Sequence, residues 1–202
     1  MSPRTTIVPR LLRFAVIASM LAACAGPSTT IEQSWRAPDA RIDKLRNPVA
    51  LYLSPDSTMR RNVEDAMVTK LARAGIRATP SYSVLTDDEL RQREAAKAKL
   101  VASGFDGVIA IRLVSKEDTI EYVPGTFDGY WGPAWSTAYS PGYLYTETVV
   151  RVEVSAYSLS NNELTWSALS KTVDPEGRRE VIDEVTTVAA NELQKQGIVA
   201  RR

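Results

Sequence analysis

Three segments before residue 115 have the hydrophobic pattern of strands. "VALYL" (49–53) and "DGVIAIRLV" (106–114) are short, nearly continuous apolar runs, which is typical of strands that are covered on both faces. "IRATPSY" (76–82) is apolar on alternate residues, but Pro80 cannot donate a ladder hydrogen bond. The pattern therefore predicts two central strands and one edge strand.

Two further strands are predicted in the second half. "TETVVRVEVSAY" (146–157) alternates apolar and polar residues, so it should be buried on one face and exposed on the other. Asn161 and Asn162 indicate a hairpin turn into "ELTWSALSKTV" (163–173). The predicted core therefore includes three alternating valines of the first of these strands and four residues of other elements: Val150, Val152, Val154, Ile109, Ile111, Val185 and Val188.

Helical periods lie between these strands. Val63, Met67 and Leu71 have helical spacing after the turn sequence "SPDST", and Gly75 supplies a stop. Thr86 and Glu89 form a predicted capping box that starts a second helix running to about residue 102.

The last predicted helix begins at Asp174 as N-cap, with Pro175 in its first position, and ends at Gly197. The order of elements is then β-α-β-α-β-β-β-α. Right-handed crossovers and the edge position of the Pro80 strand favour a mixed five-stranded sheet in the order 2-1-3-4-5. We therefore expect a single α/β domain, with helices on both faces of a parallel half and an antiparallel meander after it.

The beginning of the chain has the pattern of a secretory signal. Arg4, Arg10 and Arg13 precede an apolar stretch of about ten residues that ends in "LAAC", and about 20 would be needed to span a bilayer. "LAAC" resembles a bacterial lipobox, and this resemblance implies cleavage after residue 23 and lipidation of Cys24, the only cysteine. In that family a residue other than Asp after the cysteine, here Ala25, implies sorting to the outer membrane.

The remaining chain divides into two predicted parts. Residues 24–46 are polar and show no sustained period, so they predict a lipidated tether, with Trp35 docking onto the domain. Residues 47–202 form the α/β domain, with an aromatic insertion at 122–145. Without the three leader arginines, the 25 basic residues fall to 22, against 24 acidic residues. This balance gives no basic face for nucleic acid.

Composition excludes several kinds of active site. The chain contains no histidine, which excludes Ser-His-Asp and Cys-His catalysis and every metal site with a histidine ligand. No Gly-x-Gly-x-x-Gly or Walker-type sequence follows an early strand, so no nucleotide cofactor is predicted. No metal or other cofactor is expected.

Acidic residues leave a weaker enzyme hypothesis. Glu64 and Asp65 are expected on a helix surface, and the acids at 87–89 in the first turn of a capped helix, where they stabilise the helix. Three acids near the aromatic segment are the candidates for a hydrolase: Asp118, Glu121 and Asp128. Three serines could act as nucleophiles but have no histidine base: Ser83, Ser115 and Ser140. Lys116 remains an alternative base.

Residues 122–145 hold eight of the 15 aromatic residues (Phe 3, Trp 4, Tyr 8). The segment joins two predicted neighbouring strands, so it is expected at the tip of a hairpin. Its rings either cover the end of the sheet or remain exposed as interface residues. We expect one tryptophan to pack down and the tyrosines to point outward, which makes the candidate partner-binding residues Tyr130, Trp131, Trp135, Tyr139 and Tyr143.

Several sequence segments together resemble a family of small bacterial envelope lipoproteins of unknown function. They are "SWRAPDA", "MRRNVEDAMVTKLARAGIRATPSYSVL", "SGFDGVIAIRLV" and "NNELTWSALSKT", in this order after the lipobox. The resemblance implies an α/β domain behind a lipid anchor and transfers no catalytic residue. We therefore expect an outer-membrane-anchored periplasmic lipoprotein that binds an envelope protein or glycan without catalysis. The alternatives are an envelope hydrolase and a carrier of an apolar ligand.

Overall fold

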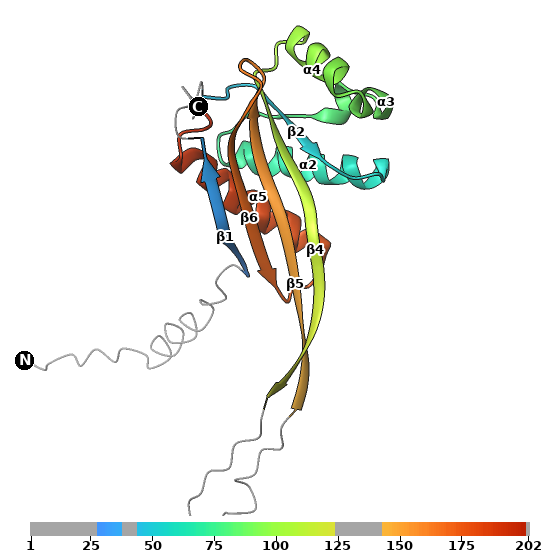
Figure 1. The fold of residues 1–202 in the computed structure, drawn as a ribbon, viewed down its shortest axis with the longest axis vertical. Coiled ribbons are helices and arrows are strands. Elements are labelled where there is room, and N and C mark those ends of the chain that lie inside the picture. Colours follow the sequence, from blue (N-terminus) through green and yellow to red (C-terminus); the bar gives the residue numbers. More distant parts are fainter. Residues whose placement is uncertain (1–27, 38–43, 124–142, 201–202) are drawn as a thin grey trace, which may run out of the picture.

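A computed structural model describes residues 28–37, 44–123 and 143–200 of the chain. Six strands form one mixed sheet in the order β1-β6-β5-β4-β2-β3 (Figure 1). The strands are β1 (Thr29–Arg36), β2 (Pro48–Tyr52), β3 (Thr79–Pro80), β4 (Gly107–Val123), β5 (Tyr143–Ser158) and β6 (Glu163–Val173). The predicted α/β class is confirmed for the described residues.

The predicted order of the five strands is also confirmed, because β3-β2-β4-β5-β6 is the arrangement 2-1-3-4-5. β2 lies parallel to both β3 and β4, whereas β4, β5 and β6 form an antiparallel meander. Pro80 lies in the two-residue edge strand β3, where its missing N–H leaves no gap in the ladder. The number of strands was wrong, since β1 adds a sixth.

β1 comes from the segment that was predicted to be a tether. It pairs antiparallel with β6, with Thr29 opposite Thr172 and Trp35 opposite Ser167. Glu184 of the last helix accepts hydrogen bonds from the backbone N–H (3.4 Å) and hydroxyl (2.8 Å) of Ser28. Burial raises the pKa of Glu184, but hydrogen bonds from Thr29 and Ser28 outweigh it and hold the pKa below its usual value. Trp35 therefore does join the domain, as part of a strand.

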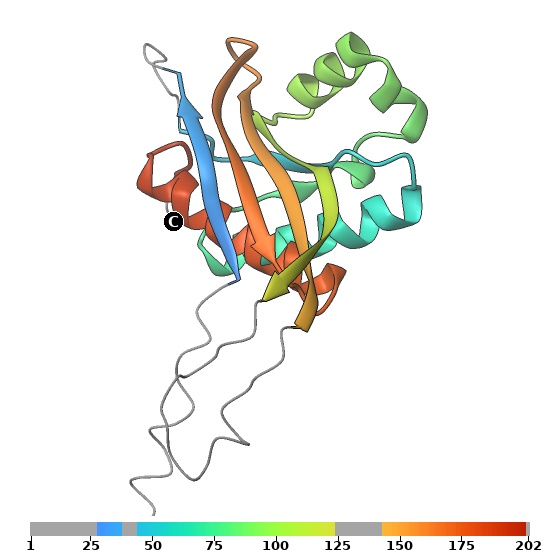
Figure 2. The same cartoon turned by 60° about the horizontal axis from the view of Figure 1, so that its bottom comes forward.

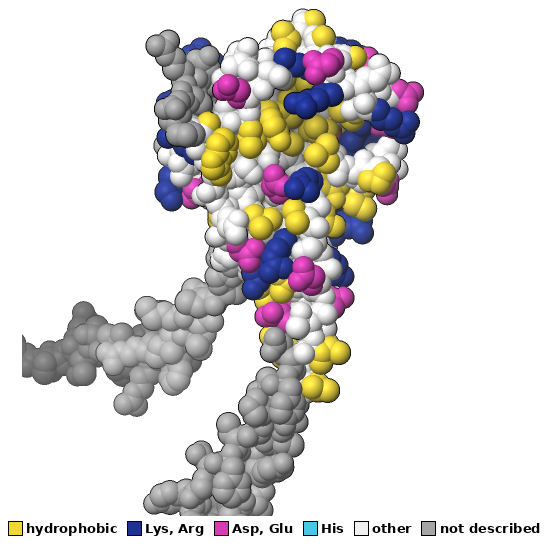
Figure 3. Space-filling model, in the orientation of Figure 1, with side chains coloured by type: hydrophobic (Ala, Val, Ile, Leu, Met, Phe, Trp, Pro, Cys, Tyr) yellow, Lys and Arg dark blue, Asp and Glu magenta, His cyan; other side chains and the backbone are white. Residues whose placement is uncertain are grey.

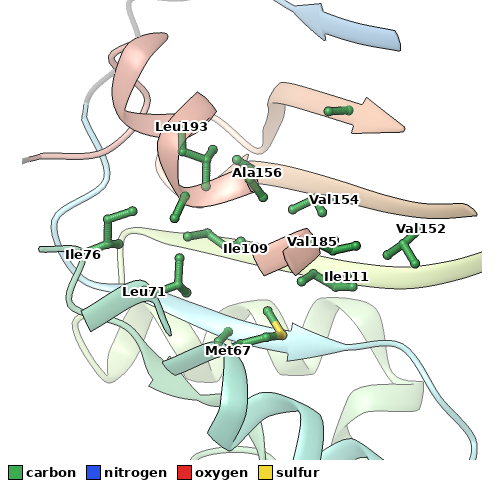
Figure 4. Packing of buried hydrophobic residues seen from close by; sticks show 14 of the residues in the cluster. Met67, Leu71, Ile76, Ile109, Ile111, Val152, Val154, Ala156, Val185 and Leu193 are labelled. Carbon is green, nitrogen blue, oxygen red and sulfur yellow. The ribbon is translucent and has the colours of Figure 1, made fainter. Parts of the chain in front are cut away.

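Two helices cover one face of the sheet, behind the strands in Figures 1 and 2. They are α2 (Ser57–Arg73), which begins at the N-cap Asp56, and α5 (Arg178–Lys195). Met67 and Leu71 of α2 and Leu193 of α5 pack with β4 and β5 in the main core (Figure 4). Gly75 follows α2 with φ of 78°, as predicted for its stop.

The helix predicted over 86–102 is two helices, α3 (Asp87–Arg91) and α4 (Arg93–Ala102), on the other face. The capping box of Thr86 and Glu89 is confirmed. A single helix was wrong because, at about 100° per residue, Leu90 would lie about 120° from Ala96 around one axis. The break at Gln92 lets Leu90 pack against the small core that contains Ala96 and Leu100.

α5 begins at Arg178, with Gly177 as N-cap, so the prediction of Asp174 as N-cap was wrong. Asp174 instead continues the end of the sheet. Its backbone N–H donates to the Thr148 carbonyl (2.8 Å), and its Oδ1 accepts from the Thr148 N–H (2.7 Å). These two bonds hold Asp174 at φ of 46°, outside a helical conformation.

Six of the seven predicted core residues are buried, and Val188 is half-buried on the flank of α5. The stripe of α5 that faces the sheet contains Val181, Val185 and Ala189. "GFDG" (104–107) ends α4 and starts β4, as expected. A Cβ at Gly107 would lie 2.5 Å from Cδ2 of Leu45 and 2.8 Å from the Tyr157 carbonyl, so glycine is required there.

The capping box makes a testable contribution to acid stability. Lys99 donates to both carboxylate oxygens of Glu89 (2.8 and 2.9 Å), and the Thr86 N–H also donates to this carboxylate. These hydrogen bonds stabilise the charged form and lower the pKa of Glu89 from 4.5 to about 2. A lowered folded pKa stabilises the protein above about 4.5, and this stabilisation is lost as the pH falls towards about 2. Glu89→Gln should therefore lower Tm at pH 7, and the difference from the wild type should shrink between these pH values. Glu163→Gln, at an exposed position, is the control, and an equal Tm difference at every pH would contradict the prediction.

Candidate functional site

An arm of two strands projects beyond the rest of the sheet. The register of β6 on β5 ends at Val173 opposite Val149, whereas β4 and β5 remain paired as far as Val123 opposite Tyr143. Residues 118–123 and 143–148 therefore form a two-stranded ribbon, about 20 Å long at about 3.3 Å per residue. The expectation of an extended hairpin is confirmed, and regular pairing reaches further into the 122–145 segment than predicted.

Apolar side chains are exposed along this arm. Ile120 is 70% exposed and Leu144 is 68% exposed. A two-stranded ribbon has no second layer to bury such side chains, and exposed apolar residues close together are typical of contact surfaces. Of the predicted partner-binding residues, Tyr143 starts β5, while Tyr130, Trp131, Trp135 and Tyr139 lie outside the described residues.

The arm also carries two of the three acids that were the candidates for a hydrolase. Asp118 accepts a hydrogen bond from the Thr148 hydroxyl across the ribbon (2.8 Å). Glu121 lies further along β4, and Asp128 is outside the described residues. Glu117, next to Asp118, points to the other face, where it pairs with Arg151 (3.3 Å). Thr148 and Arg151 therefore hold Asp118 and Glu117 on opposite faces of the sheet.

The serine candidates have local partners or lie apart from Lys116. Ser83 donates to the Pro80 carbonyl (2.8 Å). Ser115 lies opposite Arg151 and Lys116 lies opposite Val150, so successive side chains of β4 place the serine and the lysine on opposite faces of the sheet. Ser140 lies outside the described residues. The structure does not bring Lys116 to Ser115 as a base.

One carboxylate is buried where the sequence predicted a surface position. Glu64 was expected on the surface of α2, but it is 0% exposed. Its Oε1 accepts from the Ser81 hydroxyl (2.6 Å) and the Tyr52 N–H (3.1 Å), and its Oε2 accepts from the Tyr82 N–H (3.0 Å). Glu64 therefore joins α2 to the chain just after β3 and to the end of β2.

Arg60 accompanies Glu64 inside the protein. Its Nε lies 3.8 Å from Oε1 of Glu64, and its Nη1 lies 2.8 Å from Oδ1 of Asp87. Residues 60, 64, 67 and 71 share one side of a helix at spacings of four, three and four. This spacing places Arg60 and Glu64 on the same stripe as the core residues Met67 and Leu71. The spacing is therefore the sequence signal that could have identified Arg60 and Glu64 as buried.

The face of the sheet opposite α2 and α5 is partly uncovered over β1, β6, β5 and β4. Figure 3 shows hydrophobic side chains gathered on the upper part of this face, above charged side chains. Trp35 (49% exposed) and Val114 (44%) line a shallow groove there, beside an ion pair between Arg112 and Glu153. Arg151 joins Glu32 to Glu117 lower on the same face, and Glu32 raises its pKa.

Two classes of feature are absent from the described part of the chain. Residues 28–37, 44–123 and 143–200 contain no group of three or more acidic, cysteine or histidine side chains that could hold a metal ion. Among the helices of these same segments, none is both long enough and apolar enough to cross a membrane.

Comparisons with known proteins give only distant structural similarities. No protein-family profile matches the chain, and no curated protein sequence matches it. Among solved structures, it is similar to a PelC dodecamer from Paraburkholderia phytofirmans, at 14% identity over 86% of this chain and 99% of that one, with a TM-score of 0.46. It is also similar to lipoprotein GNA1162 from Neisseria meningitidis, at 14% identity over 74% of this chain and 98% of that one, with a TM-score of 0.40. Similarity at this level transfers no activity, partner or assembly to the chain.

Proposed function

We propose that this chain is an outer-membrane lipoprotein, anchored at Cys24 and facing the periplasm, that binds an envelope protein or glycan without catalysing a reaction. The β4–β5 arm is the contact element, and aromatic residues of the segment 122–145 are the binding residues: Tyr130, Trp131, Trp135, Tyr139 and Tyr143. The observation that carries this proposal is the paired ribbon with exposed Ile120 and Leu144, because the aromatic segment joins its two strands in the sequence.

The position of the anchor supports a contact at the membrane surface. Thr29 begins β1 opposite Thr172, which is itself opposite Val150, close to the base of the arm. The first strand therefore starts at the end of the sheet from which the arm projects (Figure 1). Three residues lie between Cys24 and Ser28, so the four steps from one to the other span at most about 14 Å. An anchor at Cys24 thus keeps this end of the domain near the lipid, and the arm reaches towards a partner at that surface.

Cys24→Ser tests the anchor. Because serine offers no thiol for lipidation, we expect the variant to lose acyl labelling and to remain an uncleaved precursor. Metabolic labelling with an alkyne-bearing fatty acid, together with the migration of the full chain on a gel, measures both effects. Normal labelling and processing of the variant would disprove a lipid anchor at this residue.

Site-specific photo-crosslinking tests the arm. A photoreactive amino acid at position 120 or 144 should crosslink in intact cells to one envelope protein or to glycan, because both positions are exposed on the ribbon. Replacing Tyr130, Tyr139 and Tyr143 with serine should reduce that crosslink about tenfold, since aromatic interface residues contribute a large share of binding energy. The amount of folded protein should stay unchanged.

The matched control is Val101, which is 50% exposed on α4, away from the arm. The photoreactive residue at position 101 should give no crosslink to the same partner. If the arm positions crosslink only to phospholipid, or give the same products as position 101, the proposal of an arm-borne partner site is wrong.

A further inference from the structure

A cavity of about 480 Å³ lies between the sheet and the helices α2 and α5. Its walls are mainly aliphatic and come from β2, β4, β5 and both helices. Ile111, Val152 and Val185 lie together at one end of the labelled core cluster in Figure 4, and all three line the cavity. Its volume is within the range of about 300–1,000 Å³ that is usual for small-ligand sites.

The cavity lies beside β2, the strand at which successive connections between strands lead first to one side of the sheet and then to the other. β2 ends at Tyr52 opposite Ile111 of β4, with β3 on its other side. The connection after β2 leads to β3, and the connection after β3 returns across β2 to β4. In open α/β sheets, ligands bind outside the carboxyl ends of the strands at such a switch point. Tyr52, at the carboxyl end of β2, lines the cavity, so the cavity reaches an end of this kind.

Three charged side chains also line the cavity. Lys116 of β4 and Arg178, the first residue of α5, line it together with Glu176. Both cations are exposed, and neither has a carboxylate within 4.0 Å among the described residues. The first turn of α5 adds backbone N–H groups without a side-chain cap, which favours an anion at the same place.

One apolar residue of the cavity lining is also uncovered. Leu113 lines the cavity and is 51% exposed, just before the irregularity between Leu113 and Ser115 that interrupts the β4–β5 register. Covering it would remove apolar area from water, and a ligand in the cavity is in contact with it. The apolar walls, the exposed Leu113 and the two cations that lack an ion pair among the described residues indicate a ligand with an apolar chain and one anionic end.

We propose that this cavity binds a single acyl chain carrying a carboxylate, with the chain against Ile111, Val152 and Val185 and the carboxylate between Lys116 and Arg178. A polar ligand would leave its hydrogen-bonding groups unmatched along the aliphatic walls. The cavity adjoins the base of the arm, where Thr148 lines it, but it contains none of the proposed aromatic binding residues, so it is tested independently of the partner contact.

Photo-labelling of the full chain in its own membranes tests this site. The probes are a palmitate that carries a diazirine in its chain and the alcohol with the same chain and diazirine. Palmitate adducts should map by mass spectrometry to residues that line the cavity, such as Met59, Leu113 and Ile182. Labelling by the alcohol at these residues should be about tenfold weaker, because a charge-assisted hydrogen bond is lost.

Three variants separate charge recognition from general lipid contact. Lys116→Gln with Arg178→Gln should reduce palmitate labelling of the cavity about tenfold and leave labelling by the alcohol unchanged. Lys171→Gln with Arg179→Gln removes the same charge outside the cavity lining and should change neither. Leu113→Trp places a larger side chain in the cavity at an exposed position and should reduce labelling by both probes. Equal labelling by palmitate and the alcohol, equal loss in the two double variants, or adducts only outside the cavity would overturn the proposal.

Discussion

Replacing Glu64 with alanine should lower the free energy of unfolding by about 3–5 kcal/mol. The carboxylate accepts from the hydroxyl of Ser81 and from the backbone N–H groups of Tyr52 and Tyr82, and all three donors lose their acceptor in the variant. Arg60 also loses a nearby opposite charge, although it keeps Asp87 at 2.8 Å. Urea denaturation of the full chain measures the effect as a lower midpoint at constant slope.

The neighbouring Asp65 provides a matched control. It is exposed, and its carboxylate accepts from the Tyr82 hydroxyl at the surface (2.5 Å), so Asp65→Ala should cost less than about 1 kcal/mol. Adding Arg60→Met to Glu64→Ala should restore little stability, because the backbone donors of Tyr52 and Tyr82 remain without an acceptor. If the two alanine variants have the same midpoint, Glu64 does not join the elements as described.

Trp166→Ala is the second large expected effect, a loss of about 3–5 kcal/mol of unfolding free energy. Trp166 is 0% exposed in β6 and belongs to the main core, where it lies opposite Ala156 of β5. Alanine leaves a cavity that the surrounding strands and α5 can fill only partly. Thermal or urea unfolding measures the loss.

Two further variants show whether the loss comes from packing. The indole Nε1 of Trp166 has no hydrogen-bond partner among the described residues, so Trp166→Phe keeps much of the volume and removes that buried donor. It should cost clearly less than alanine. Trp35→Ala, on the neighbouring strand β1 and 49% exposed, should cost under about 1 kcal/mol. Equal losses at positions 35 and 166 would show that burial does not decide the effect.

The site that supports the functional proposal was only partly visible in the sequence. The density of aromatic residues at 122–145 identified the segment, and its position between neighbouring strands predicted a hairpin. The length of the paired arm was not predicted, because the exposed residues of a two-stranded ribbon have no burial period to reveal it. The cavity beside Lys116 and Arg178 was not predicted either, since its walls come from five elements that are distant in sequence.

Local patterns in the sequence determined the elements whose burial follows a simple period. The alternation of Val150, Val152 and Val154 set the buried face of β5, and Pro80 set the edge of the sheet. Both features act within a few residues, through side-chain direction and a missing N–H group, so the sequence expresses them directly. The connections between these elements then left one favoured strand order, which the structure has.

Only the tertiary structure decided the features that depend on distant partners. β1 is held by backbone pairing with β6, more than 100 residues away, and backbone hydrogen bonds need no particular side-chain pattern. Gln92 breaks a helix because two apolar groups must reach one small core. Glu64 is buried because donors from β2 and from the turn after β3 meet its carboxylate. In each case the stabilising partner comes from another part of the chain, and only folding brings it into contact.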